Sequence, residues 1–164
     1  MQHGNTLYSI SWDDCTVTRY DNLTEDGAVC KTVIASLDKM RAFPATTLVE
    51  GRWLFVIGGV DGSPDPSAST WYLDLLSGDF SEGPRLNEGR YAHCTAVIGG
   101  CIYVIGGHYG EEEDEPDSIE KLNVAENEQA WTSFSIPGFL KRQKPVVCRL
   151  NDSEILVAGG HQGQ

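Results

Sequence analysis

One pattern recurs three times in this chain and limits the folds open to it. In residues 89–107 an arginine precedes a short β-branched strand, a two-glycine turn, a second apolar strand and the pair Gly106-Gly107. Residues 40–59 and 141–160 repeat the same order. Two short strands joined by a two-residue turn predict a β-hairpin. The chain is therefore expected to be built from β-rich repeats.

The second half of each repeat lies between the diglycines. After each diglycine a polar loop leads to a third short strand, expected over residues 71–74 and 119–123, and then to an aromatic residue, Phe80 or Trp131. No helical stripe longer than a turn or two is present. Each repeat is therefore expected to hold four short strands, and a repeat of roughly 50 residues has the size of a propeller blade.

The N-terminal segment fits the same frame from its second strand onward. Residues 7–12 align with the strand that ends at a diglycine, although Ser11-Trp12 stands in place of the glycines. Residues 15–21 and 29–36 then take the third and fourth places. The predicted boundaries are a partial blade over 1–39, full blades over 40–89 and 90–140, and the first half of a further blade over 141–164.

These features resemble the kelch-repeat family of β-propellers. The resemblance rests on the diglycine that closes an apolar strand, on pairs such as Leu73-Asp74 and Leu122-Asn123, on the aromatic that follows, and on the arginine that starts the next repeat. It covers nearly the whole chain. It implies an all-β fold, namely a kelch-type propeller segment of four-stranded antiparallel blades that forms an incomplete ring of about three blades.

The repeat pattern gives structural roles to three kinds of residue. Glycine pairs permit positive φ where the chain leaves the sheet beside a bulky neighbour. The recurring aromatics are expected in the core. The recurring arginines are expected to cap carbonyls, with recognition of a ligand by an arginine ring as the alternative. These residues are Gly58, Gly59, Gly106, Gly107, Gly159, Gly160, Arg41, Arg90, Arg142, Phe80 and Trp131.

The formal net charge of −12 disfavours negatively charged partners. Nucleic acid and anionic membranes both require a basic protein face, so neither is expected to bind. A protein partner with a basic surface fits this charge. Residues 1–20 hold no sustained apolar run, and no stretch approaches transmembrane length, so neither a signal peptide nor a membrane span is expected.

The five cysteines are scattered singly, without a C-x-x-C pair. Cys94 and Cys101 flank the Gly99-Gly100 turn, but a two-residue hairpin places Cys94 opposite Ile105, out of register for a disulfide with Cys101. This cysteine usage favours a reduced protein in the cytoplasm.

The candidate partner-binding residues lie in the loops after the diglycines. His108 and His161 each follow a diglycine, so they are expected at equivalent places on one rim. Residues 111–117 form an acidic run, interpreted either as a solvated insertion or as a docking surface for a basic peptide. The candidates are Asp61, His108, Tyr109, Glu111, Glu112, Glu113, Asp114, Glu115 and His161. No ligand spacing or nucleophile motif predicts a metal, a cofactor or catalysis.

Three classes of function stay open at this point. The resemblance implies a protein–protein interaction module, for example the substrate-recognition part of a ubiquitin-ligase adaptor. The alternatives are a propeller enzyme of the copper-oxidase or lyase/epimerase type and an actin-binding structural protein. No catalytic constellation is found, which favours a protein that is not an enzyme.

The strand tally leaves a partial blade at each end of the chain. Propellers hide their sheet edges by closing into a ring of about four to eight blades. Exposed edges and apolar faces promote association. We therefore expect these ends to meet either the remaining blades of a longer chain or another copy of this chain.

Overall fold

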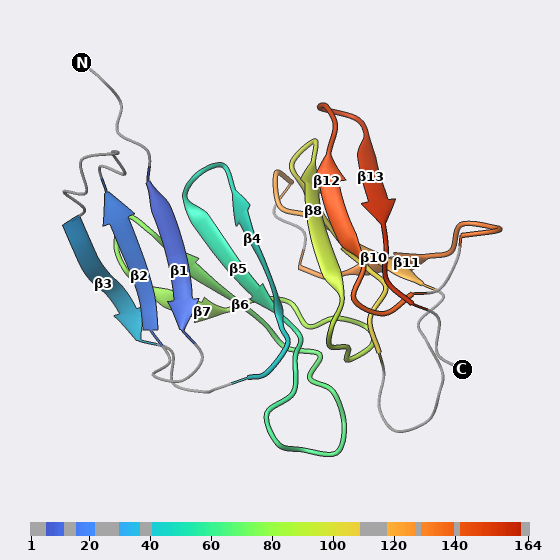
Figure 1. The fold of residues 1–164 in the computed structure, drawn as a ribbon, viewed down its shortest axis with the longest axis horizontal. Coiled ribbons are helices and arrows are strands. Elements are labelled where there is room, and N and C mark those ends of the chain that lie inside the picture. The colour runs from blue at the N-terminus through green and yellow to red at the C-terminus, as the bar shows by residue number, and fades with distance from the viewer. Residues whose placement is uncertain are drawn as a thin grey trace.

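The strands in the described part of the chain form four separate antiparallel sheets in the computed structural model. Figure 1 shows the sheets following one another across the molecule, from the N-terminal strands in blue to the C-terminal hairpin in red. None of the described stretches forms a helix of the length and apolar character that a membrane span requires. The structure describes residues 6–11, 16–21, 30–36, 41–108, 118–126, 129–139 and 142–161.

The first sheet has the strand order β1-β2-β3. Its strands are β1 (Leu7–Ser11), β2 (Thr16–Asp21) and β3 (Cys30–Ser36). Both pairs are antiparallel, and the register of β2 against β3 shifts between Val17 and Thr18. The segment predicted to begin at the second strand of a repeat therefore contributes three strands to one sheet.

The second and third sheets are four-stranded meanders in which neighbours in sequence are neighbours in the sheet. Short hairpin turns join some of these strands without a crossover, and a longer loop, residues 58–69 in the second sheet, joins the second strand to the third. The second sheet contains β4 (Ala45–Val49), β5 (Trp53–Ile57), β6 (Thr70–Asp74) and β7 (Phe80–Glu82). The third contains β8 (Cys94–Ile98), β9 (Cys101–Ile105), β10 (Ile119–Asn123) and β11 (Thr132–Phe134).

The described part of the fourth sheet is a hairpin of β12 (Val146–Arg149) and β13 (Ile155–Ala158). β13 pairs with the strand before it as β5 and β9 do in their own sheets. The prediction that these three strands are equivalent is confirmed, and so is the all-β fold of four-stranded antiparallel sheets. The sheets are separate, as blades are, rather than parts of one continuous sheet.

The Gly99-Gly100 turn sets the register of the hairpin that it closes. Ile98 pairs with Cys101, and Cys94 pairs with Ile105. The predicted mismatch of Cys94 and Cys101 is therefore confirmed. The cysteines that lie in the described stretches, Cys30, Cys94, Cys101 and Cys148, are free thiols.

The main core lies between the second and third sheets. Trp131 precedes β11, is 4 % exposed, and donates a hydrogen bond from Nε1 to the Pro84 carbonyl at 2.8 Å. Phe80 is partly buried, packs against a second core cluster of Val17, Leu54 and Leu73, and stacks on Trp71 with ring centroids 5.2 Å apart. Trp131 is therefore more deeply buried than Phe80. The buried cluster consists of Val49, Phe55, Ile57, Leu86, Ile102, Val104, Leu122 and Trp131.

Replacing Trp131 by alanine is expected to lower the free energy of unfolding by on the order of 3 kcal/mol, because it empties a buried aromatic site. Urea denaturation followed by circular dichroism measures the change. Phe134→Ala is the matched control, since Phe134 lies in the adjoining strand but is 37 % exposed. Equal losses in the two variants would contradict the burial assigned to Trp131.

Candidate functional site

Backbone hydrogen bonds at the diglycines join the second sheet to the third and the third to the fourth. The Gly59 N–H donates to the Arg90 carbonyl at 2.9 Å, and the Gly107 N–H donates to the Arg142 carbonyl at 3.1 Å. A Cβ on Gly58, whose φ is +64°, would stand 2.4 Å from that Arg90 carbonyl oxygen. Only glycine avoids both the contact and the strained backbone. The first glycine of the pair is therefore required by the approach of the next sheet.

A second set of backbone hydrogen bonds links the segments that precede the first strands of the second, third and fourth sheets. The Ala92 N–H donates to the Phe43 carbonyl at 3.0 Å, and the Lys144 N–H donates to the Ala92 carbonyl at 2.8 Å. These three residues hold equivalent places and all have positive φ, at 53°, 52° and 50°. Non-glycine residues rarely adopt this conformation, and surrounding contacts must hold them in it. Together the two sets of hydrogen bonds hold the neighbouring ends of the second, third and fourth sheets against one another.

The recurring arginines cap carbonyls, as the repeat pattern predicted. Arg41 Nη1 donates to the carbonyls of Gly58 and Ser69 at 3.4 and 3.3 Å. Arg90 Nη1 donates to Gly106 and Ser118, and Arg142 Nη1 donates to Gly159. Each arginine thus stabilises the point where a second strand ends at its diglycine.

Arg90 also forms a fully buried ion pair. Its Nη2 lies 2.7 Å from Oε1 of Glu120, and both side chains are completely shielded from solvent. Glu120 further accepts bonds from the backbone N–H groups of Asn87 and Glu88, at 2.7 and 3.3 Å. These bonds satisfy the carboxylate, which a buried charge requires. The pair ties the segment before Arg90 to β10.

The predicted histidines lie beside these bonds, at the ends of the sheets where the second strands reach their diglycines. Val60, His108 and His161 form isolated antiparallel bridges to Ala42, Tyr91 and Gln143. His108 and His161 therefore hold equivalent positions after their diglycines, which confirms that prediction. The long β5–β6 loop leaves the second sheet at the same end (Figure 1). We call this end of the sheets, with its bridges and loops, the rim.

Aromatic rings gather on the rim. Tyr91 stacks on His108, with ring centroids 5.2 Å apart and planes 10° apart. Phe43 lies 6.4 Å from Tyr91 on the other side and is 61 % exposed. We call these three residues the aromatic rim patch. Sequence analysis identified His108 but missed Phe43 and Tyr91, although both closely follow a repeat arginine.

A polar hollow of about 470 Å³ lies beside the β5–β6 loop. Asp61, a predicted candidate, lines it, and hydrogen bonds from Ser63 hold the pKa of Asp61 below its usual value. Arg41 and Arg85 also line the hollow. His161 is exposed. The candidates Tyr109, Glu111, Glu112, Glu113, Asp114 and Glu115 lie outside the described residues.

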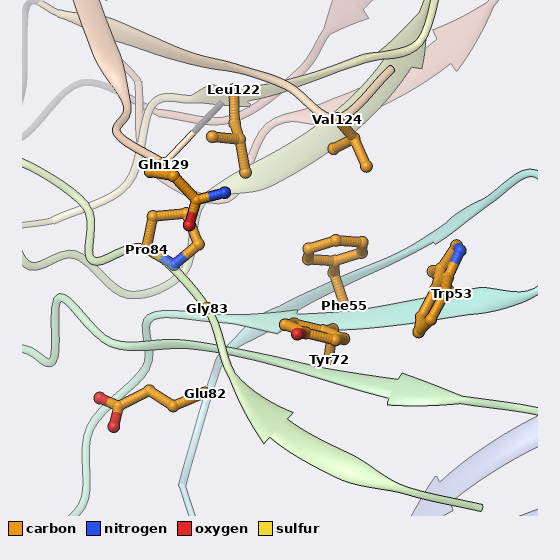
Figure 2. A pocket seen from close by; sticks show the side chains of 9 residues that line it. All are labelled: Trp53, Phe55, Tyr72, Glu82, Gly83, Pro84, Leu122, Val124 and Gln129. Carbon is orange, nitrogen blue, oxygen red and sulfur yellow. The ribbon is translucent and has the colours of Figure 1, made fainter. Parts of the chain in front are cut away.

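A second cavity, of about 480 Å³, lies between the second and third sheets. Figure 2 shows Trp53, Phe55 and Tyr72 on one side of it and Leu122 and Val124 on the other. Glu82 also lines it, but its carboxylate points away from the rings (Figure 2). The cavity adjoins the core cluster. Its lining mixes these apolar side chains with polar ones, Glu82 and Gln129.

The described residues hold few groups with chemical reactivity. Within these stretches no three or more His, Cys, Asp or Glu side chains gather as metal ligands. Burial raises the pKa of the Cys94 thiol to about 11, so this thiol stays protonated at neutral pH.

Comparison with known proteins follows this geometry. A family model described as the Kelch motif matches residues 89–133. Kelch-like protein 23 of Pongo abelii is 32% identical over 117 residues, which cover 69% of this chain and 19% of that protein. An F-box/kelch-repeat protein of Arabidopsis thaliana is 41% identical over 72 residues, which cover 43% of this chain and 18% of that protein.

Two solved structures share the fold. YjhT superposes with a TM-score of 0.72 at 13% identity, over 89% of this chain and 53% of that chain. A fungal alcohol oxidase in complex with copper gives 0.66 at 16% identity, over 87% and 31%. At these identities the likeness shows the fold alone.

The sheets, their order and the diglycine contacts define a segment of a β-propeller. With its motif match and its kelch-repeat relatives, the chain belongs to the kelch-repeat proteins. It spans about a fifth of the length of the curated relatives it matches, 19% for the human Kelch-like protein 23.

His93 makes the stability of the fold depend on pH. Burial, and then the charge of Arg90, lower the pKa of His93 from 6.5 to about 3. The unfolded chain therefore binds more protons than the folded chain between these values, so stability is full above pH 6.5 and falls as the pH drops toward 3.

The melting temperature of the unmodified chain is expected to fall steadily between pH 6.5 and pH 4.5 for this reason. His93→Leu is expected to flatten that slope, because leucine does not titrate. His108→Leu is the control, since His108 is only partly buried. Thermal melts at a series of pH values test both, and an unchanged slope in His93→Leu would show that other groups dominate.

Proposed function

We propose that this chain is part of a kelch-type propeller that binds a protein partner through its rim. The observation that carries the proposal is the aromatic rim patch of Phe43, Tyr91 and His108. Exposed aromatic rings are enriched at the centres of protein interfaces and supply much of the binding energy there. Kelch repeats generally serve as protein-interaction modules, in keeping with this proposal.

The rigidity of the rim supports the same function. The patch draws residues from two sheets, and the Ala92 N–H···O=C Phe43 bond holds those sheets together beside it. Side chains on a fixed backbone lose less conformational freedom when a partner binds. The rim thus offers a preorganised surface, with the β5–β6 loop next to it.

The finer part of the proposal concerns context. Relatives carry the names Kelch-like protein 23 and F-box/kelch-repeat protein. We propose by analogy with them that the chain recognises the substrate within a ubiquitin-ligase adaptor. Capture of a cullin subunit by the natural full-length protein tests this role separately.

Replacing Phe43 and Tyr91 together by alanine is expected to reduce capture of the partner at least tenfold, because interface aromatics commonly contribute about 2 kcal/mol or more each. Tagged chain and crosslinking in lysate, read by quantitative mass spectrometry, measure the capture. Leu76→Ala is the control, since Leu76 is 79 % exposed in the turn between β6 and β7. Equal capture by all three proteins would refute the rim as the binding surface.

Neutralising the acidic run, with Glu111, Glu112, Glu113 and Glu115 changed to Gln and Asp114 to Asn, tests the charged part of the rim. The affinity for a basic partner is expected to fall, and its dependence on salt to weaken, because exposed charges act over about 8–10 Å near physiological ionic strength. Binding is measured from 50 to 300 mM NaCl, a range chosen around the ionic strength where screening sets in.

The control for the acidic run neutralises Glu50 and Glu126, two exposed acids outside the rim loops. This control lowers the net negative charge of the chain without touching residues 111–115. If both variants lose affinity to the same degree per charge removed, the effect belongs to net charge. The acidic run would then be a solvated insertion.

A further inference from the structure

Two equivalent arginines in successive repeats have different partners. Arg90 is neutralised by Glu120, which pairs with Val104 in the third sheet. In the second sheet the place opposite Val56 is taken by Trp71. Val56 and Val104 each stand two residues before a diglycine. Trp71 therefore occupies the position of Glu120, and Arg41 lacks the carboxylate that Arg90 has.

Arg41 is a buried cation that forms no direct ion pair in the described part of the chain, although Asp61 and Glu82 act on its charge from beyond ion-pair distance. It is 8 % exposed, and no ion pair joins it to a carboxylate there. Both of its hydrogen bonds in these stretches use Nη1, so Nε and Nη2 remain as donors. Burial lowers the pKa of Arg41, and Asp61 and Glu82 partly offset the effect. A guanidinium still stays charged at any physiological pH.

The hollow beside Arg41 offers further donors to an acidic group. Arg85 contributes a second guanidinium, and Ser67 and Ser69 lie in the same lining. The Ser63 hydroxyl is already used, because it donates to Asp61. Ser67 and Ser69 bond to one another at 2.9 Å, so one of their hydroxyl protons stays available. Guanidinium and hydroxyl donors together match the oxygens of a carboxylate. The volume of about 470 Å³ accommodates an acidic side chain.

The acidic side chains of the hollow determine which kind of carboxylate ligand can bind there. Asp61, Asp65 and Glu82 also line it, and all three are exposed. Their negative charge repels a free anion. An acidic residue flanked by lysine or arginine suits the hollow, because its carboxylate pairs with Arg41 and its basic neighbours pair with these three acids.

We propose that the hollow binds an Asp or Glu side chain of a protein partner, set between basic residues, with Arg41 as its principal contact. The proposal rests on the proposed function, since it assumes a protein partner at the rim. It adds the chemistry of the sequence that is recognised. The net charge of −12 on the chain attracts such a basic segment.

The test uses the full chain and a synthetic peptide, acetyl-Lys-Ser-Glu-Ser-Lys-amide, in a calorimetric or NMR titration. The peptide is expected to bind, and the version with Gln in place of Glu to bind at least about tenfold more weakly, because it lacks the charge that pairs with Arg41. Glutarate is the free-acid probe. Equal affinity for glutarate and the Glu peptide, or for the two peptides, would overturn the proposal.

Two substitutions at one position separate charge from packing. Trp71→Glu supplies the carboxylate that Glu120 supplies in the next repeat, whereas Trp71→Gln removes the ring without adding charge. Both lose the stack on Phe80. Trp71→Glu is expected to melt at a higher temperature than Trp71→Gln and to bind the Glu peptide at least about tenfold more weakly, because its own carboxylate occupies Arg41.

Equal melting temperatures or equal peptide affinities in the two variants would refute the role given to Arg41. The outcome is separable from that of the rim experiment. If Phe43 and Tyr91 govern partner capture but the peptide does not bind, the protein-binding function stands and the carboxylate hollow falls. If the peptide binds through Arg41 while the rim variants capture normally, the aromatic rim patch falls instead.

Discussion

The approach of each sheet to its neighbour depends on a backbone hydrogen bond at the diglycine. The carbonyl of Arg90 accepts this bond from Gly59, and it stands where a side chain on Gly58 would otherwise be. The apolar cluster between the second and third sheets closes only at this spacing. Apolar burial supplies most of the stabilisation, but the backbone bonds determine how the sheets are placed to achieve it.

The buried charges of the repeats, those of the arginines, lie at the same diglycine ends of the sheets. The guanidinium groups of Arg41 and Arg90 are buried where they cap the carbonyls at the ends of the second strands. A buried charge is costly unless it is paired. The third sheet meets this requirement with Glu120. The second sheet has Trp71 at that place, and its arginine faces a hollow at the surface instead. A structural residue of one repeat thereby becomes a candidate for recognition in another.

The rim combines three properties that an interface needs. Its backbone is fixed by bonds between sheets, Phe43 is exposed with Tyr91 and His108 partly exposed beside it, and the acids of its loop line a polar hollow. The cavity beside Phe55 and Tyr72 differs, because it adjoins the apolar core between the sheets. Recognition is therefore expected at the rim, where polar and aromatic groups lie side by side.

The sequence by itself determined the strands, their register and the carbonyl-capping arginines. Turn length and the two-residue period of a strand are local properties, and they place Cys94 opposite Ile105 without reference to other sheets. Only the tertiary structure decided what the sheets present to one another and to solvent. Phe43 and Tyr91 stand at different distances from their arginines, and the unequal burial of Phe80 and Trp131 depends on which sheet covers each. Contacts between sheets join residues far apart in sequence, so no local pattern records them.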